Sequence, residues 1–414
     1  MKQLKTQSTT IGERSAGMLE GSRAQLVLLA TSHGMNHAYQ LLMPIIMFEV
    51  AADYKLSNLT AGILFAFFNL SYSLLPLLFG YLARVFSRRL LLALGFAVSA
   101  FAFLAMGFVD NIAIFALLLF IAGVGGSTYH PNGISILADT CPTSNRGQTL
   151  GLHQTGGAIG SFIGPVVAGV LVLIYAWRAT LMIFAIPGVI LAVILWFSIS
   201  PEQPRAKSNA KQGSRSRFSL EVYGSAILLI IAGFIYAFGR AGTDNFAPKY
   251  FTDGRGINPF EASLLFATLK AAGLFSAPLC GRLSDVFNRK RVLIALVIVE
   301  SVSLYAITVT STTLLAVPCL VFGFASFGLL GVGEALLADI TSEEWRSTFF
   351  GAGATLSFAP AIFLPPILGG IADVYSFDVG FILLSALMLL SIPLILKVKT
   401  KPAQQNKKLH RLIR

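Results

Sequence analysis

Two matching stretches, GYLARVFSRR at residues 80–89 and GRLSDVFNRKR at residues 281–291, decide the fold of this chain. Further residues recur at nearly the same offset of 200 positions. The matches are Leu137-Ala138-Asp139 with Leu337-Ala338-Asp339, Arg146 with Arg346, Gly151 with Gly351, Pro165 with Pro365, Gly169 with Gly369 and Tyr175 with Tyr375. Small residues can recur by chance, but Asp and Arg recurring together at one loop argue against chance. The sequence therefore predicts two duplicated halves.

The composition excludes a soluble enzyme and a disordered chain. Of the 414 residues, 55% are hydrophobic and only 12% are charged, whereas an ordinary soluble protein is about one-quarter charged. The surface must therefore face something other than water. Three cysteines, Cys141, Cys280 and Cys319, lie too far apart to indicate a disulfide framework or a zinc site.

The apolar runs are long enough to cross a bilayer, which takes about 20 helical residues. They cover residues 24–48, 59–83, 90–108, 112–138, 148–174, 178–199, 222–247, 260–283, 291–310, 313–338, 347–372 and 376–397. Unsatisfied backbone groups are costly in hydrocarbon, so these runs are helices. We predict an all-α membrane protein with twelve transmembrane helices in two six-helix bundles. The first bundle covers residues 1–199, a basic Pro/Ser-rich linker covers 200–221, and the second bundle with a basic tail covers 222–414.

Lys and Arg are concentrated in one set of loops. That set holds Lys2, Lys5, Arg14, Arg23, Arg84, Arg88, Arg89, Arg146, the segment 205–217, Arg282, Arg289, Lys290, Arg291, Arg346 and the tail 397–414. The opposite set holds only Lys55, Arg178, Lys249 and Arg255. By the positive-inside rule, both termini and the linker are expected in the cytoplasm of a prokaryotic cell, with the chain in the inner membrane. The net charge of +12 then needs no nucleic-acid partner, and residues 1–22 do not resemble a removable signal peptide.

The loop at 281–291 carries a family resemblance. Gly281, Leu283, Asp285, Arg289 and Lys290 fit the pattern G-x-L-[SA]-D-x-x-x-R-[RK], while Arg84 occupies the Asp position in the first half. In this respect the whole chain resembles the major facilitator superfamily. The resemblance implies a secondary transporter of small molecules, in which two bundles rock around a site at the membrane midplane.

Two further motifs refine the resemblance. Glycines and a proline in the fifth run are similar to a motif of antiporters, although close helix packing alone also explains them. They are Gly156, Gly160, Gly164, Pro165 and Gly169. The chain also resembles the fosmidomycin-resistance exporters through His33-x-x-Asn36-His37, Leu42-x-Pro44, Gly123-x-Gly125-Gly126-x-x-Tyr129-His130-Pro131 and Gly147-Gln148-x-Leu150. It departs from that pattern at His37 and Asn132, where acidic residues are expected.

Four histidines lie within apolar runs, where an ionisable side chain faces a cavity or a partner by default. His33 and His37 are four residues apart and share a helix face with Asn36 and Gln40. The resemblance places runs one, four and five around the central cavity, and runs four and five supply the remaining candidate residues of the pathway. These are His130, Asn132, His153 and Gln154. We expect a substrate or proton pathway here, because histidine titrates near physiological pH; a structural hydrogen bond is the alternative for each histidine.

The fourth run is expected to bend or break at His130-Pro131, because proline removes a backbone donor and glycines surround it. A broken helix in a cavity wall is a plausible binding element. A purely structural kink is the alternative.

The second half offers Arg240 and Asp244, four residues apart in the seventh run, and Lys270 in the eighth. We expect Arg240 to pair with Asp244 until a proton on the carboxylate releases the guanidinium. Arg240 and Lys270 are two buried cations and favour a substrate with an acidic or phosphonate-like group. The alternative is that Arg240 stays paired with Asp244 permanently and that the Lys270 side chain extends to the membrane interface. Glu334 is a proton site or a gate residue. Glu300 lies in the ninth run, which the resemblance places at the periphery, so we leave it out of the site.

Six charged residues are expected at cytoplasmic helix ends. They are Asp139, Arg146, Asp285, Arg289, Asp339 and Arg346. Asp285 is expected to accept from a helix N-terminus and Arg289 to meet Asp339, closing the cytoplasmic side in the outward-open state. Solvated loop charges, worth well under about 1 kcal/mol each, are the alternative.

The sequence has no P-loop, no nucleophile paired with a base and no H-E-x-x-H spacing. We therefore expect no enzyme, cofactor or metal site, and an ion gradient as the energy source. The first hypothesis is a monomeric, proton-driven antiporter in the lipid bilayer that exports a small anionic or amphiphilic compound and gives drug or antibiotic resistance by efflux. The alternatives are a proton-coupled symporter importing an organic anion, a membrane-embedded receptor that does not transport, and, least favoured, a membrane enzyme.

Overall fold

A computed structural model of the chain describes residues 2–83, 85–140, 146–199, 220–341 and 343–400. Within these ranges the side chains of residues 2–22, 138, 139, 146–148, 150, 151, 220–222, 274, 277 and 343–348 are not described. The expected linker at 200–221 therefore lies almost entirely outside the described residues.

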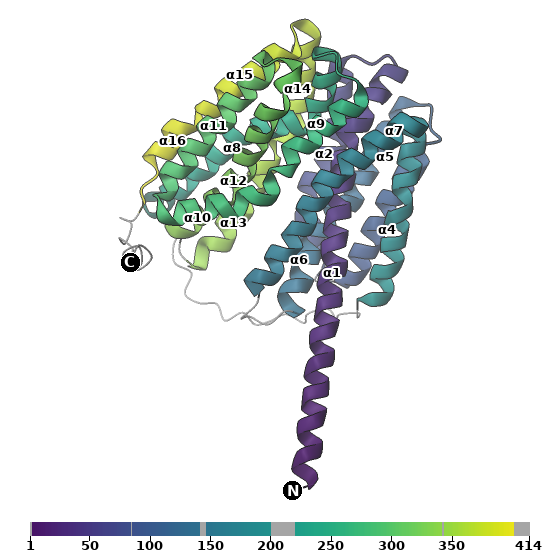
Figure 1. Ribbon diagram of the computed structural model, residues 1–414, viewed down its shortest axis with the longest axis vertical. Helices are drawn as coiled ribbons and strands as arrows, with labels where there is room; N and C mark the ends of the chain where they lie inside the picture. The colour runs from purple at the N-terminus through teal and green to yellow at the C-terminus, as the bar shows by residue number, and fades with distance from the viewer. Residues whose placement is uncertain (1, 84, 141–145, 200–219, 342, 401–414) are drawn as a thin grey trace.

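The described chain is helical along nearly its whole length (Figure 1). The first half contains α1 (Lys2–Asp53), α2 (Asn58–Leu74), α3 (Pro76–Leu82), α4 (Arg88–Met106), α5 (Ile112–Ser127), α6 (Tyr129–Thr140) and α7 (Arg146–Ser198). The second half contains α8 (Leu220–Lys249), the π-helical turn η1 (Tyr250–Gly254), α9 (Pro259–Ala271), α10 (Gly273–Val286), α11 (Arg289–Val309), the 3-10 turn η2 (Thr312–Leu314), α12 (Ala316–Ile340), α13 (Glu343–Phe358), α14 (Pro360–Val374), α15 (Phe377–Leu389) and α16 (Ser391–Lys397).

These helices confirm the twelve-span fold. Among the described residues, nine helical segments are long and apolar enough to cross a membrane. One of them, Leu152–Ser198, contains two spans because the chain reverses at Ala176 (φ 62°, ψ 173°). The α9–α10 pair and α1 supply the remaining two spans. The hydropathy of α1 is lowered by its own polar residues around His33 and His37.

Local capping repeats between the halves. Ser57 and Asn258 accept hydrogen bonds at the N-termini of α2 and α9, and Ser87 and Asn288 do so at α4 and α11. Such side chains satisfy backbone N–H groups that a helix leaves free. Each pair is separated by 201 positions, so the structure extends the duplication that the loop motifs predict.

We use "distal end" for the end of the bundle where α1 stops at Asp53 and "proximal end" for the end where α4 starts at Arg88. A continuous hydrophobic core joins the first half to the distal part of the second half, including Phe65 of α2 and Phe246 of α8. A separate core around Leu293 and Ile395 belongs to the second half alone. The halves are therefore packed together at the distal end and have separate cores toward the proximal end.

The glycine motif of the fifth span packs α7 against α1. A Cβ atom on Gly160 would lie 1.9 Å from the carbonyl oxygen of Gly34, and one on Gly156 would lie 2.2 Å from that of Ala30. Gly164 similarly meets Ala38, whereas Gly169 meets Ser263 of the second half. Small residues allow such close backbone approach, so packing is one established role of this motif.

Gly160→Ala is expected to lower the apparent unfolding temperature of the purified protein. The new methyl group has backbone on its contact side, and overpacking costs about 1–3 kcal/mol. The matched control is Gly224→Ala, whose Cβ meets nothing within 4 Å and which adds a better helix former. Unfolding can be followed with a thiol-reactive dye, because Cys280 and Cys319 are buried. Equal unfolding temperatures for the two variants would contradict the packing role.

Candidate functional site

Four histidines from three helices form one group in the first half, which we call the histidine cluster: His33, His37, His130 and His153. His33 lies at its centre and is 1% exposed. Its ring stacks on His153 with centroids 4.2 Å apart, and it lies 4.7 Å from His37 and 5.2 Å from His130. The structure therefore brings together the histidines that the sequence predicts in runs one, four and five.

Hydrogen bonds define the orientation of these rings. His33 Nδ1 donates to the backbone oxygen of His153 at 3.0 Å, so in the neutral ring His33 Nε2 is an acceptor. His37 Nε2 faces that atom at 3.1 Å and donates to it. Tyr129 donates its hydroxyl proton to the backbone oxygen of Leu29, so His153 Nε2, 2.9 Å from the phenol, is the donor in that contact.

Two tyrosines that the sequence analysis did not assign to the site hold this arrangement. Besides Tyr129, Tyr72 of α2 accepts from the side-chain amide of Asn36 at 2.8 Å and lies 3.4 Å from His130 Nε2. Because the phenol accepts from Asn36, its proton is available to His130. The position of Tyr129 directly before His130 is the one sequence signal that pointed to either tyrosine.

The fourth span is interrupted close to the predicted position, at Thr128, two residues before His130-Pro131. Helix α5 ends at Ser127, α6 begins at Tyr129, and Pro131 lies in its first turn. Asn132 is fully buried and donates to the backbone oxygen of Thr128 at 2.7 Å, so it satisfies a carbonyl at the break. Asn132 Oδ1 has no hydrogen-bond partner among the described residues. The break places His130 against α1.

The expected ion pair between Arg240 and Asp244 is wrong in this structure. Asp244 on α8 instead forms an ion pair and hydrogen bond with Lys270 of α9. The lysine side chain is only 9% exposed, and the carboxylate is 28% exposed. An unpaired buried ammonium group is strongly unfavourable, which explains why Lys270 of α9 pairs with the carboxylate of Asp244 on α8. Lys270 also interacts electrostatically with His37 of the first half.

Arg240 points elsewhere. Its guanidinium donates to the backbone oxygen of Ser357 at 3.1 Å and lies over the ring of Phe358, 5.5 Å from its centroid. Helix α13 ends at Phe358, so its last carbonyl groups lack helical partners and are free to accept. Arg240 makes no ion pair with a carboxylate among the described residues, but its charge interacts electrostatically with the buried Glu300.

Glu300 corrects another expectation, because the structure does not place it at the periphery. Its side chain on α11 is 1% exposed, and its Oε2 has no hydrogen-bond partner among the described residues. It interacts electrostatically with Arg240, Asp244 and Lys270. The available signal was chemical: an acid inside an apolar run must face the interior whatever the usual place of its helix.

Other predicted pathway residues are more open. Gln154 and Glu334 are exposed, and Gln40 is half-buried. Tyr236 interacts electrostatically with Arg240, Glu300 and Glu334. Glu334 therefore lies near the same tyrosine as the charges of Arg240 and Glu300. No contact of Gln154 with the histidine cluster is present among the described residues.

The predicted meeting of Arg289 and Asp339 is confirmed. Arg289 Nε lies 2.9 Å from Asp339, and its other guanidinium nitrogen lies 2.8 Å from Asp285. Asp285 pairs with Arg289, and no contact of its carboxylate with a helix N-terminus is present among the described residues. All three residues belong to the second half, so these contacts tie α10, α11 and α12 together and do not cross between the halves. The side chains of Asp139, Arg146 and Arg346 lie outside those described.

The distal end holds direct contacts between the halves. Asp373 of α14 accepts from the backbone N–H groups of Asn58 and Leu59 at 2.9 and 2.8 Å, where the helix dipole of α2 favours a carboxylate. Deeper in the same interface Asn69 donates to Asn245 at 2.8 Å. Gly62 and Gly369 permit this approach, since Cβ atoms there would lie 2.3 and 2.2 Å from backbone oxygens of the facing helix.

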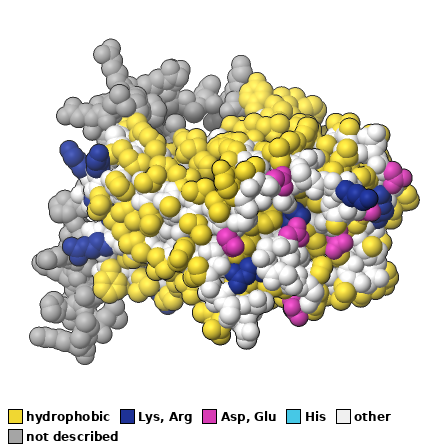
Figure 2. All heavy atoms as spheres, turned by 90° about the horizontal axis from the view of Figure 1, so that it is seen from above, with side chains coloured by type: hydrophobic (Ala, Val, Ile, Leu, Met, Phe, Trp, Pro, Cys, Tyr) yellow, Lys and Arg dark blue, Asp and Glu magenta, His cyan; other side chains and the backbone are white. Residues whose placement is uncertain are grey.

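Basic residues at the distal end are mostly engaged by neighbouring groups. Arg178 donates to the backbone oxygen of Val109 at 2.7 Å and pairs with Asp110 at 2.8 Å. Arg255 donates to the backbone oxygen of Thr308 at 2.8 Å, and Lys249 pairs with Asp253. Figure 2, which looks onto this end, shows few charged side chains and several of opposite sign side by side. No described histidine is visible on that face.

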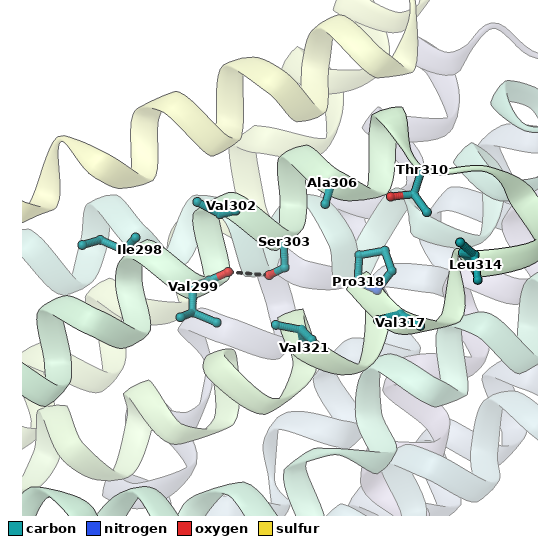
Figure 3. A pocket seen from close by; sticks show the side chains of 10 residues that line it. All are labelled: Ile298, Val299, Val302, Ser303, Ala306, Thr310, Leu314, Val317, Pro318 and Val321. Carbon is teal, nitrogen blue, oxygen red and sulfur yellow. Dashed lines mark hydrogen bonds between the residues drawn. The ribbon is translucent and has the colours of Figure 1, made fainter.

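A separate groove of about 510 Å³ lies between α11 and α12 (Figure 3). It is lined by Ile298, Val299, Val302, Ser303, Ala306, Thr310, Leu314, Val317, Pro318 and Val321. The hydroxyl of Ser303 donates to the backbone oxygen of Val299 at 2.6 Å, as the dashed line in Figure 3 shows. This lining contains no titratable group and none of the predicted pathway residues.

Comparison with known proteins decides the family. The family model described as "Major Facilitator Superfamily" matches residues 27–267 and 229–413. The chain belongs to the major facilitator superfamily. It is therefore a multi-pass membrane transporter, and the family assignment agrees with the loop motif and the duplicated halves. The resemblance to fosmidomycin-resistance exporters stays a prediction.

Relatives of this facilitator differ in what their names say they transport. It is 24% identical over 366 residues to the multidrug resistance protein MdtG of Dickeya zeae, covering 86% of this chain and 89% of the relative. It is 25% identical over 381 residues to the benzoate transport protein of Acinetobacter baylyi, covering 80% and 78%. A probable nitrate transporter, NarT of Staphylococcus haemolyticus, is 22% identical over 339 residues, covering 80% and 84%.

Solved structures show the same fold. A bacterial homologue of the human lysosomal transporter Spinster, in an inward-facing and unoccupied conformation, superposes with a TM-score of 0.76 at 17% identity, covering 92% of this chain and 99% of that one. The nucleoside transporter NupG also superposes with a TM-score of 0.76, at 13% identity, covering 90% and 99%.

Proposed function

We propose that this facilitator is a proton-driven antiporter that exports a small anionic or amphiphilic compound. The observation that carries the proposal is the buried Lys270–Asp244 ion pair between α8 and α9. Arg240, whose guanidinium makes no ion pair among the described residues, lies one helical turn from Asp244. A proton on Asp244 neutralises the carboxylate and releases Lys270. Two cations are then available to hold an anion, and losing the proton restores the competing carboxylate. Protonation of Asp244 therefore decides whether Lys270 is available to an anion, which couples proton and substrate at one place.

The same mechanism fits the packing of the halves. Closure at the distal end by Asp373 and the glycine contacts, together with separate cores toward the proximal end, supports alternating access with the site facing the proximal side. The excess of Lys and Arg in the proximal loops supports a cytoplasmic location for that side and for both termini. We place the protein in a bacterial inner membrane, where MdtG relatives support a role in efflux.

A second candidate is a proton symporter that imports an organic anion. The ion pair favours it as well, because an anion that binds after Asp244 is protonated is carried together with the proton. The benzoate and nitrate transport proteins among the relatives agree with an anionic substrate. The two candidates differ in the direction in which the proton moves relative to the substrate.

Proteoliposomes with a pH-sensitive dye inside test the proposal. For an antiporter, an organic anion or amphiphilic drug added outside acid-loaded vesicles raises the internal pH, because each substrate entering releases a proton. For a symporter, an anion added outside with an acidic external buffer lowers the internal pH. Absence of any substrate-dependent pH change across benzoate, phosphonate and amphiphilic drug probes would leave a receptor as the remaining function.

Asp244→Asn is expected to abolish substrate-dependent proton movement while the protein still binds its substrate, because the amide imitates the protonated state and leaves Lys270 free. Glu261→Gln, an exposed carboxylate on α9, is the matched control and should keep proton movement. Proton movement by Asp244→Asn at the rate of the parent protein would overturn the assignment of this carboxylate.

A further inference from the structure

The sequence predicts no metal site because H-E-x-x-H spacing is absent, and His130 is remote in sequence from the His33–His37 pair. The broken fourth span removes that separation. Helix α6 begins at Tyr129 and presents His130 to α1, where His33 and His37 lie one turn apart. One ring nitrogen from each of the three residues lies within 4.8 Å of the others. This side-chain group lies in the first half, whereas the ion pair on which the proposed function rests lies in the second half, where Lys270 interacts electrostatically with His37.

The distances suit a small cation. Two imidazole nitrogens that bind one Zn²⁺ in tetrahedral geometry at 2.0–2.1 Å are about 3.4 Å apart. The Nε2 atoms of His33 and His37 are already 3.1 Å apart. His130 is half-buried, and its described hydrogen bond is the long 3.4 Å contact with Tyr72. It is therefore the ring most able to turn and close the remaining distance.

The surrounding hydrogen bonds are those of a metal ligand. A histidine that binds a metal usually donates its other ring N–H to a carbonyl or carboxylate, which fixes its tautomer. His33 Nδ1 donates to the backbone oxygen of His153 and leaves Nε2 unprotonated toward His37. His153 does not belong to the group of ring nitrogens that lie within 4.8 Å of one another, and its Nε2 is occupied by the contact with Tyr129. The ligand set therefore consists of three neutral imidazoles, and the proton that His37 Nε2 donates to His33 in this structure moves to His37 Nδ1 when an ion binds.

This donor set selects the class of ion. Imidazole ligands suit Zn²⁺, Co²⁺, Ni²⁺ and Cu²⁺, whereas Mg²⁺ and Ca²⁺ require oxygen ligands. We propose that His33, His37 and His130 bind a divalent transition metal ion of the Zn²⁺ type. Three protein ligands leave a fourth position for water or an anion.

Binding of Co²⁺ and Zn²⁺ to the purified protein tests this proposal without any gradient or substrate, so its outcome is independent of the proposed transport. The protein carries no polyhistidine tag, and all samples carry His410→Ala to remove the remaining histidine. Co²⁺ is expected to bind at one equivalent with the intense visible bands of tetrahedral coordination. Zn²⁺ should displace it and raise the unfolding temperature, because a ligand of the native state stabilises it.

His37→Gln and His130→Gln, at half-buried positions, are expected to weaken Co²⁺ binding by more than the 10–100-fold that changes to second-shell partners cause. His153→Gln is the matched control and should keep the affinity, because the amide can donate to Tyr129 and the backbone oxygen is retained. Size-exclusion profiles establish that each variant is folded. Absence of tetrahedral bands in the parent protein would overturn the proposal, as would unchanged bands in folded His37→Gln and His130→Gln.

Discussion

Replacing Lys270 with Met is expected to destabilise the protein by about 3–5 kcal/mol, the usual effect of removing one partner from a buried ion pair. The substitution leaves the carboxylate of Asp244 on α8 without its described ion-pair partner. The methionine has a similar volume, so the loss comes from the uncompensated charge rather than from a cavity. The measurement is thermal unfolding in detergent, followed by the exposure of the buried cysteines to a thiol-reactive dye.

The double variant Lys270→Met with Asp244→Asn separates charge from packing. Removing both charges is expected to recover most of the lost stability, because replacing a buried pair by neutral groups is often neutral or better. The double-mutant cycle then gives a large coupling energy between the two residues. Additive effects would show that Asp244 and Lys270 do not interact as the structure places them. Both variants are nevertheless expected to lose substrate-dependent proton movement.

The helices were predictable because each signal is local. Runs of about 20 apolar residues and the proline at 131 depend only on neighbours in sequence. The spans, and the interruption of the fourth span at Thr128, lie at or close to the positions that these patterns predict. The histidine cluster was partly predictable, since His33 and His37 share a face by helical spacing. The stacking of His153 on His33 depends on the close approach of α7 to α1, which the glycines at 156 and 160 permit.

The pairing of charges could not be read from spacing. Arg240 and Asp244 satisfy the i,i+4 rule, yet a carboxylate inside a protein is also available to a neighbouring helix. Lys270 lies 26 positions away, and its meeting with Asp244 follows from how α9 packs on α8. Glu300 was left out of the predicted site for a related reason. The usual position of its helix in the fold does not determine which face of that helix carries the carboxylate. In both residues the tertiary arrangement decides what local rules leave open.

Gly369→Ala is expected to shift the protein away from the state with its distal end closed. The new Cβ would lie 2.2 Å from the backbone oxygen of Asn58, so α14 and α2 cannot approach as they do here. Overpacking costs about 1–3 kcal/mol, and here the cost falls only on the conformation with its distal end closed. The population of that conformation relative to the one with its distal end open is therefore lowered by about 5–150-fold. The same displacement weakens the contacts of Asp373 with the N-terminus of α2.

Spin-label distances measure this shift. In a background without native cysteines, Ala52→Cys and Tyr375→Cys report on the distal end, and Val85→Cys and Phe287→Cys report on the proximal end; all four positions are exposed. Gly369→Ala should lengthen the distal distance and shorten the proximal one, since rigid halves that separate at one end approach at the other. Gly370→Ala is the adjacent control, because its Cβ meets only the Leu59 side chain at 3.8 Å. If both glycine variants kept the parent distances at both ends, the α2–α14 contact would not be what closes the distal side.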